Sequence, residues 1–346
     1  MKTPLSNNCR RVVKLIEEAS KVSIIHHWDS DGIASAVLIA KKYKDKISSF
    51  IIPRIGEYNI EAIDVNELKK LNPDLVLILD YGIPLSQLKI LEKSIGVKVA
   101  VIDHHVNEFT VNAFCNPIAF GCAEEEYPST TWVLREILGL EEFPDIVALG
   151  IIGDLGKAIK DSSLLRWIEE NIKSRGLVID DIIHAVNVVD SCYRLVDYEC
   201  IDYVRRVLIE HKVKDIITDD YLRSKLLRLS EELSKALSSV KLVKEHDGFI
   251  KVFKVTTDAY ITSLIGRELA YKHHNSIIVL QHEVKKLNKK YIYIRSYKYN
   301  LRSVLEAFKS MNMNVGGKDK VLVISCDGKT YEMDTIINTI ATYIQA

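Results

Sequence analysis

Short, continuous apolar runs separated by amphipathic stretches dominate the first half of the chain. Runs such as 75–79 and 97–102 are rich in Val, Ile and Leu, which is typical of strands buried on both faces of a parallel sheet. The stretches between the runs carry apolar residues at intervals of three and four, which predicts helices. Strands that alternate with helices predict right-handed βαβ crossovers and an α/β fold.

The pattern divides the chain into three regions. The strands expected in the first region cover residues 22–26, 49–52, 75–79 and 97–102. A long helical period follows, and from residue 249 strands and helices alternate again, with strands expected at 249–255, 276–280, 291–295 and 321–325. We therefore predict a parallel-sheet domain over residues 1–190, a helical connector over 191–245 and a smaller α/β domain over 246–346.

Acidic and imidazole side chains follow the apolar runs of the first region. They are His27, Asp29, Asp31, Asp80, Asp103, His104, His105 and Asp154. One Asp at such a position is ordinarily a helix cap. Four separate strand or helix ends that all carry acids or imidazoles favour a shared site, because ligands gather beyond the carboxyl ends of strands in open α/β sheets.

This donor set indicates a chemistry. Clustered carboxylates repel one another, and two divalent ions about 3.5–4 Å apart that share one carboxylate would relieve the repulsion. Such a pair supports hydrolysis of a phosphate ester. Mixed imidazole and carboxylate donors favour Mn²⁺, with Mg²⁺ as the alternative. Gly32 is expected to allow a tight turn from the first strand into the next helix.

Composition limits the partners and the compartment. The 346 residues contain 47 basic and 47 acidic side chains, so a nucleic acid would have to bind a local basic patch. The six cysteines are scattered without metal-binding spacing, and we expect them to be unpaired core residues in a reducing cytosol. The sequence shows neither a membrane-spanning run nor a signal peptide, so we expect a cytoplasmic protein without a membrane partner.

Four motifs in order resemble those of the DHH phosphoesterase family, and in particular the archaeal RecJ-like nucleases. They are His27-x-Asp29-x-Asp31-Gly32, Asp80-Tyr81-Gly82, Asp103-His104-His105 and Gly150-Ile-Ile-Gly-Asp154. The resemblance implies that His27 and Asp29 bind one metal ion, and that Asp31, His104 and Asp154 bind a second. It also implies that Asp80 bridges the two ions, that His105 contacts the scissile phosphate, and that Asp103 orients an imidazole.

The last 100 residues resemble the DHHA1 domain of the same family more loosely. In that domain an Arg-Ser pair on a strand and a glycine-rich loop hold the substrate, which implies that Arg295, Ser296, Gly316, Gly317 and Lys318 bind substrate here. Lys318 stands where the family commonly has a His. Near these residues, basic side chains interleave with Tyr291, Tyr293, Tyr297 and Tyr299, a composition that suits single-stranded nucleic acid. An ordinary solvated hairpin explains the same composition.

Taken together, these features predict a two-metal phosphodiesterase that acts as a single-strand-specific exonuclease on DNA or RNA, with a role in repair or replication. Both polarities of digestion fit the sequence, and we favour 3′→5′. One alternative is a small-substrate enzyme: an oligoribonuclease, a 3′-phosphoadenosine-phosphate phosphatase or a cyclic dinucleotide phosphodiesterase. Another is a non-catalytic scaffold in a helicase complex. An active nuclease could also dock on a helicase or another replication protein.

Overall fold

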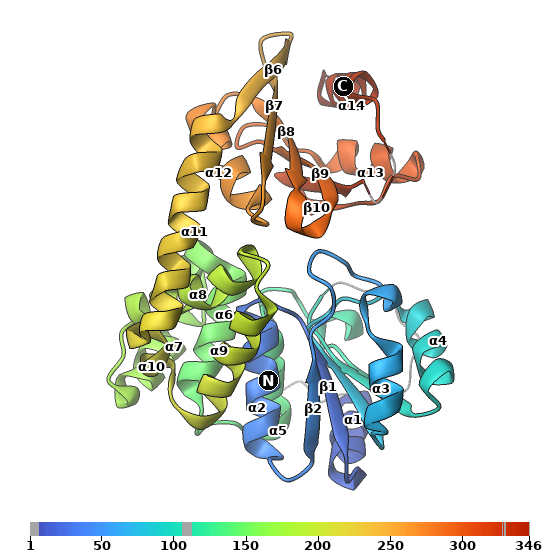
Figure 1. The fold of residues 1–346 in the computed structure, drawn as a ribbon, viewed down its shortest axis with the longest axis vertical. Coiled ribbons are helices and arrows are strands. Elements are labelled where there is room, and N and C mark those ends of the chain that lie inside the picture. The colour runs from blue at the N-terminus through green and yellow to red at the C-terminus, as the bar shows by residue number, and fades with distance from the viewer. Residues whose placement is uncertain (1–6, 106–112, 327, 329, 346) are drawn as a thin grey trace. The chain divides into compact units, whose positions relative to one another are not determined.

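The computed structural model describes residues 7–105, 113–326, 328 and 330–345. The chain forms two compact units (Figure 1). The first contains the residues up to 193 together with 197–226, and the second contains 194–196 and the residues from 227 onward. The helical connector expected over 191–245 is therefore divided between the units, and the chain passes from one to the other within α11 (Asp220–Ser239).

A five-stranded parallel sheet forms the centre of the first unit. Its strands are β1 (Val22–His26), β2 (Ile47–Ile51), β3 (Leu75–Leu79), β4 (Lys98–Ile102) and β5 (Phe114–Cys115). They lie in the order β2-β1-β3-β4-β5. Every residue of β1 and β3 is buried, which explains their unbroken apolar runs. The strand order reverses beside β1, and such a switch point is where open α/β sheets bind ligands.

Helices cover both faces of this sheet, with α2 and α5 on one face and α3 and α4 on the other (Figure 1). The helices of the first unit are α1 (Asn7–Glu18), α2 (Ser30–Lys42), α3 (Val65–Leu71), α4 (Leu85–Ile95), α5 (Thr130–Leu138), α6 (Pro144–Leu155), α7 (Leu165–Ile172), α8 (Ile179–Arg194), α9 (Tyr198–Glu210) and α10 (Val213–Thr218). Strong contacts join α6 to α2 and to α5. This packing brings the C-terminal end of α6 to the same edge of the sheet as the N-terminus of α2.

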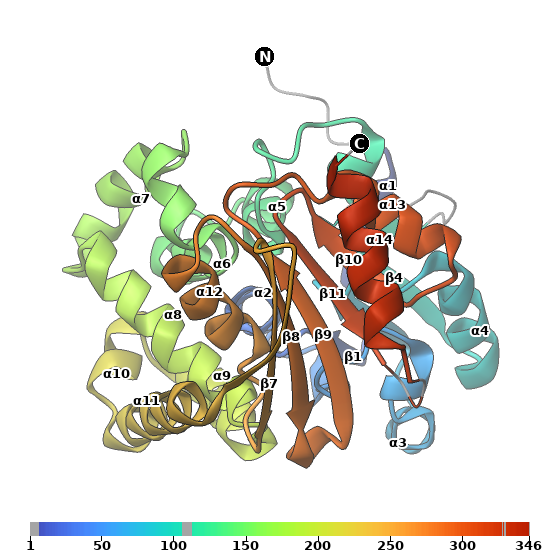
Figure 2. The ribbon, with the colours of Figure 1, turned by 90° about the horizontal axis from the view of Figure 1, so that it is seen from above.

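A six-stranded mixed sheet forms the second unit. Its strands are β6 (Lys241–His246), β7 (Ile250–Thr257), β8 (Ile277–Val284), β9 (Lys289–Arg295), β10 (Val315–Lys318) and β11 (Val321–Ser325). They lie in the order β10-β11-β9-β8-β7-β6, and only β7 and β8 pair in parallel. As Figure 2 shows, α12 (Thr262–Lys272) covers one face, while α13 (Arg302–Ser310) and α14 (Met333–Gln345) cover the other.

The expectation that the cysteines are unpaired is wrong for four of the six. Cys9 of α1 is bonded to Cys115 of β5, and Cys192 of α8 is bonded to Cys200 of α9. Spacing along the chain could not reveal the first pair, because 106 positions separate its members. Among the helices that the structure describes, none is both long and apolar enough to cross a membrane.

Candidate metal centre

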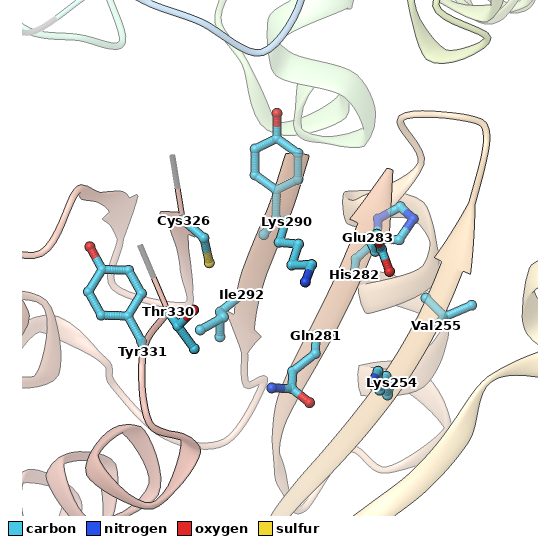
Figure 3. Close-up of a pocket in the computed structure, with 11 residues that line it drawn as sticks. Lys254, Val255, Gln281, His282, Glu283, Lys290, Ile292, Cys326, Thr330 and Tyr331 are labelled. Carbon is cyan, nitrogen blue, oxygen red and sulfur yellow. The ribbon is translucent and has the colours of Figure 1, made fainter. Parts of the chain in front are cut away.

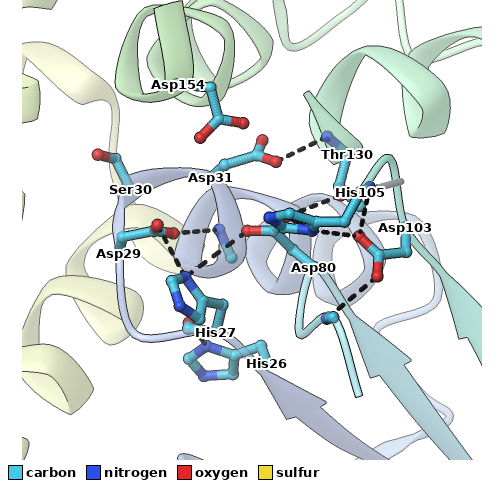
Figure 4. A network of polar contacts seen from close by, with 12 residues as sticks. His26, His27, Asp29, Ser30, Asp31, Asp80, Asp103, His105, Thr130 and Asp154 are labelled. Carbon is cyan, nitrogen blue, oxygen red and sulfur yellow. Dashed lines mark hydrogen bonds and ion pairs between the residues drawn. The ribbon is translucent and has the colours of Figure 1, made fainter. Parts of the chain in front are cut away.

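The acids and imidazoles of the four motifs lie together at the carboxyl ends of β1, β3 and β4 (Figure 4). Parallel strands end at one edge of the sheet, so residues far apart in the sequence meet there. His27 follows β1, Asp80 follows β3, and Asp103 follows β4. Asp154 reaches the cluster from the end of α6. The structure thus brings together all of the acids and imidazoles that the sequence analysis singled out in this unit.

The first motif positions its three polar residues differently from one another. Asp29 is the N-cap of α2, where its carboxylate accepts a hydrogen bond from the amide of Gly32 at 3.1 Å. Asp31 lies within the first turn of α2. His27 Nδ1 lies 2.7 Å from Asp29 Oδ2 and 3.9 Å from Asp80 Oδ2.

Gly32 is required for close packing and not for an unusual backbone angle. A Cβ at this position would lie 2.5 Å from the Cβ and the carbonyl oxygen of His27. Any other residue would therefore push α2 away from the end of β1. Gly150 serves the same purpose on α6, because a Cβ there would lie 2.2 Å from Asp31 Oδ1 and from Thr131 Oγ1.

Asp80 lies between the other members of the cluster. Its φ is +56°, an uncommon value for a non-glycine residue, and its amide donates to the carbonyl of Ile102 on the neighbouring strand. Its Oδ1 accepts a hydrogen bond from Thr130 Oγ1 at 3.0 Å and lies 3.5 Å from His104 Nε2. The left-handed backbone lets the carboxylate face the side chains that follow both β1 and β4.

Asp103 holds the loop that carries both histidines. Its Oδ1 accepts hydrogen bonds from the amides of His104 and His105, at 2.7 and 3.1 Å, and lies 2.7 Å from His105 Nδ1. Its Oδ2 accepts from the amide of Gly82. These contacts orient His105, whose side chain is 45% exposed, while His104 Nε2 lies 3.1 Å from Asp154 Oδ2.

Two threonines at the start of α5 also belong to the site, and the sequence analysis missed them. The amides of Thr130 and Thr131 donate to the two carboxylate oxygens of Asp31, at 2.6 and 3.0 Å. Helix N-termini favour negative charge, so α5 stabilises the buried Asp31. The available signal was the Ser129-Thr130-Thr131 run at a helix start, but it does not show which carboxylate the helix faces.

These side chains form two overlapping sets of potential metal ligands that share Asp80. One set is His27, Asp29 and Asp80, and the other is Asp31, Asp80, His104 and Asp154; within each set the ligand atoms lie within 4.8 Å of one another. A third group joins Asp80, His104 and His105.

The donor atoms fit divalent ions. His27 Nδ1 and His104 Nε2 are buried and have no hydrogen-bond partner among the described residues, although carboxylate oxygens lie 2.7 and 3.1 Å away. Imidazole nitrogens placed beside carboxylate oxygens in this way could bind a divalent ion through their lone pairs once they are deprotonated.

Without cations the cluster contains more negative charge than it can hold favourably. Burial, and then the charges of Asp31 and Asp29, raise the pKa of Asp80 well above its ordinary value. Burial and the charge of Asp154 raise the pKa of Asp31 to about 6. For Asp29, burial acts in the same upward direction, but the charge of His27 outweighs it and lowers the pKa to about 2.

The histidine pair and Asp103 form a subset whose opposite charges stabilise one another. Burial acts to lower the pKa of His105, but Asp103 outweighs it and raises the pKa to about 9. Burial of His104 is likewise outweighed by Asp154, so the pKa of His104 rises. Burial would raise the pKa of Asp103, but the charge of His105 lowers it below the ordinary value. This subset keeps His105 protonated at neutral pH.

In the second unit, the residues predicted to bind substrate fall into two groups. Arg295, Val321 and Lys318 lie opposite one another on three adjacent strands and thus share one face of the sheet. Arg295 Nη1 donates to the hydroxyl of Tyr293, and its guanidinium lies 5.1 Å from the ring centre of Tyr297. Arg295 and Lys318 are therefore cations on the same face of the sheet as Gly316, and no atom lies within 4 Å of a Cβ at Gly316.

Ser296 and Gly317 form the second group, and both have a role in the fold of the second unit. Ser296 is fully buried, and its hydroxyl donates to the carbonyl of Ser276 and accepts from the amide of Tyr299. Gly316, Gly317 and Lys318 do not form a loop; they lie in the edge strand β10. At Gly317, where φ is +147°, a Cβ would lie 2.2 Å from the carbonyl oxygen of Val321.

The tyrosines near Arg295 are mostly core residues. Tyr291 and Tyr293 are each only 2% exposed, so they are not available to stack on bases. Tyr293 packs against α12 at Gly266, where a Cβ would lie 2.2 Å from the tyrosine ring. Tyr297, at 45% exposure, is accessible. The expectation of an interleaved aromatic surface is therefore wrong for the two tyrosines on β9.

A separate cavity of about 180 Å³ lies on the second unit. Figure 3 shows Lys254, Gln281 and Lys290 on adjacent strands of its floor, with Tyr331 at its side. Glu283 also lines it, so both signs of charge are present. Tyr291 lines this cavity, whereas Arg295, Ser296 and the β10 residues predicted to bind substrate do not.

Comparison with known proteins agrees with the geometry. Residues 21–151 match the model of the DHH family, N-terminal domain. The single-stranded-DNA-specific exonuclease RecJ of Salmonella typhimurium is 24% identical over 196 residues, which is 47% of this chain but only 33% of that protein. The chain thus spans about a third of this relative.

Two solved structures share the fold at low identity. Exonuclease RecJ bound to manganese superposes with a TM-score of 0.63 at 16% identity, covering 99% of this chain and 94% of that one. A pGpG-specific phosphodiesterase from Vibrio cholerae gives 0.51 at 13% identity, covering 93% and 99%. Likeness at this level concerns the fold alone, whereas the match over residues 21–151 includes the first three motifs and shows that this part of the chain is similar to the N-terminal domain of the DHH family.

Proposed function

We propose that this chain is a phosphodiesterase that uses two divalent ions, Mn²⁺ or Mg²⁺, at the carboxyl ends of β1, β3 and β4. The observation that carries the proposal is the position of Asp80, which belongs to both sets of potential ligands. In this proposal His27 and Asp29 complete the first metal site, and Asp31, His104 and Asp154 complete the second. The exonuclease RecJ with the same fold has been solved with manganese bound.

The metal pair would activate a water molecule and stabilise the oxygens of a phosphoryl displacement. The chain's own residues prepare the rest of the site. The α5 amides and Thr130 hold Asp31 and Asp80 in fixed orientations. Asp103 keeps His105 oriented, and His105, with a 45% exposed side chain, can donate a hydrogen bond to a phosphate oxygen or to the leaving group.

The substrate we infer is the end of a single nucleic-acid strand, DNA or RNA. The relative from Salmonella acts on single-stranded DNA, and the second unit carries Arg295 and Lys318 on one face of its sheet. Cationic side chains there would bind the phosphate backbone, and exposed Tyr297 could stack on a base.

A small dinucleotide is the second candidate substrate. The burial of Tyr291 and Tyr293 leaves few aromatic residues to bind a long strand, the net charge of the chain is zero, and a pGpG-specific phosphodiesterase has the same fold. The intact set of ligands argues against a purely structural role.

A time course on single strands labelled at the 5′ end, in Mn²⁺ and in EDTA, tests the proposal. The wild type is compared with Asp80→Asn and with Asp64→Asn, which changes an exposed acid that caps α3. We expect a descending ladder in Mn²⁺ for the wild type and for Asp64→Asn, and no product for Asp80→Asn or in EDTA.

Each other outcome changes the assignment. Immediate release of a labelled mononucleotide would mean attack from the 5′ end. Cleavage of dinucleotides alone would favour the small-substrate enzyme. Undiminished activity of Asp80→Asn would refute the two-metal site, and a wild type that cleaves none of these substrates with either metal would refute the proposed enzyme.

A further inference from the structure

Tyr58, in the loop between β2 and α3, contacts the proposed metal centre through His27, and neither the motifs nor the proposed function gives it a role. We infer that Tyr58 is a positioning residue: its hydroxyl oxygen fixes the orientation and the tautomer of His27, so that Nδ1 presents a lone pair to the first metal ion. This inference rests on the proposed metal site.

The two ring nitrogens of His27 have different surroundings. Nδ1 faces the carboxylates of Asp29 and Asp80, at 2.7 and 3.9 Å. Nε2 lies 3.3 Å from the hydroxyl of Tyr58, the contact that the structure gives this nitrogen. When Nδ1 binds a metal ion, the proton of the neutral ring must be on Nε2. Nε2–H then donates to the Tyr58 oxygen, as metal-bound histidines commonly donate through their second nitrogen.

Tyr58 is held firmly enough to act in this way, although its ring is 49% exposed. Its ring stacks on that of Tyr81, with centres 6.0 Å apart and planes 20° apart, and its centre lies 5.4 Å from that of Trp28. The hydroxyl of buried Tyr81 donates to the carbonyls of Glu57 and Asn59, the residues on either side of Tyr58. Tyr81, which directly follows Asp80, thus fixes the main chain on both sides of Tyr58.

The ring of His27 has few other restraints. Trp28 packs beside it with ring centres 4.3 Å apart, which limits tilting but does not distinguish one nitrogen from the other. Only polar contacts distinguish the two ring nitrogens. Tyr58 supplies the polar contact to Nε2, on the side of the ring away from Asp29 and Asp80. Loss of the hydroxyl would therefore leave the second tautomer and a flipped ring accessible, and both weaken the first site.

The test is the Mn²⁺ affinity of the substrate-free protein, measured by the electron paramagnetic resonance signal of free Mn²⁺ during titration. Tyr58→Phe removes the hydroxyl and keeps the ring, and Tyr58→Leu removes both. Tyr203→Phe is the matched control, because it deletes a hydroxyl on α9 that donates a 2.8 Å hydrogen bond to Asp219, the C-cap of α10. Thermal unfolding in EDTA shows whether each variant is folded.

We expect Tyr58→Phe to weaken one of the two Mn²⁺ sites about tenfold or more, with the other changed less than about twofold. Tyr58→Leu should match it, and Tyr203→Phe should match the wild type. If Tyr58→Phe binds Mn²⁺ like the wild type, the inference fails, and if Tyr58→Leu alone is weakened, the ring and not the hydroxyl positions His27. If the wild type binds no Mn²⁺, the proposed function itself fails.

Discussion

Replacing Asp31 by Asn should make the stability of the metal-free protein less dependent on pH. Asp31 is completely buried, and burial together with the charge of Asp154 raises its pKa from 3.8 to about 6. The folded protein therefore binds a proton at this carboxyl over a pH range in which the unfolded chain has released it. Stability must fall as the pH rises through that range.

The magnitude follows from the pKa difference. A difference of one in pKa corresponds to about 1.4 kcal/mol, so ionising Asp31 in the folded state costs about 3 kcal/mol once the pH is above about 6. Below about pH 4 the cost is absent, because both states are protonated. Asp80 adds to this pH dependence, because the charge of ionised Asp31 raises the pKa of Asp80. The lost hydrogen bond to an α5 amide lowers the stability of Asp31→Asn by the same amount at every pH.

The assay is denaturant unfolding of the wild type and of Asp31→Asn in EDTA at pH 4, 6 and 8. We expect the free energy of unfolding of the wild type, relative to the variant, to fall by about 3 kcal/mol from pH 4 to pH 8. In saturating Mn²⁺ the wild type should regain stability, by about 2.7 kcal/mol at a hundredfold excess over Kd. A difference between the two proteins that does not change with pH would refute the reasoning that burial and the charge of Asp154 raise the pKa of Asp31.

Three further predictions concern packing, the disulfide and the orientation of His105. Gly150→Ala places a Cβ 2.2 Å from Asp31 Oδ1, so it should lower the free energy of unfolding by about 1–3 kcal/mol and weaken Mn²⁺ binding. Gly153→Ala should lower the free energy of unfolding less than Gly150→Ala, because the atom nearest to its Cβ is the Ser30 hydroxyl oxygen at 2.9 Å. Equal losses for the two variants would contradict this. Cys9→Ser removes a disulfide that spans 106 positions, so it should lower the free energy of unfolding, measured with denaturant, by about 4–5 kcal/mol. If reductant does not change the stability of the wild type, this prediction is contradicted. Asp103→Asn should lower the rate of hydrolysis but retain both Mn²⁺ ions, because Asp103 is in neither ligand set, and loss of both ions on titration would count against its role.

The part of the site that follows strands could be predicted from the sequence. The apolar run 75–79 marks β3 correctly, and the run 22–26 marks β1. Once these runs are assigned to a parallel sheet, the residues that follow them must meet at one edge, whatever their separation along the chain. Asp80 and His27 could therefore be placed in one site before the structure was known.

Other parts depend on packing between distant segments, which no local pattern reveals. Thr130 binds Asp31 across 99 positions, and Tyr58 reaches His27 across 31. The two glycines of β10 lack any local signal for a strand, so they were expected to form a loop. The burial of Tyr293 depends on the absence of a side chain at Gly266 on α12, which strand alternation cannot show.

The most direct test of the two-metal site is anomalous diffraction near the Mn absorption edge from crystals soaked in Mn²⁺. The account predicts two peaks about 3.5–4 Å apart, with a carboxylate oxygen of Asp80 beside each of them. Two peaks elsewhere, one peak away from Asp80, or none at saturating Mn²⁺ would contradict it.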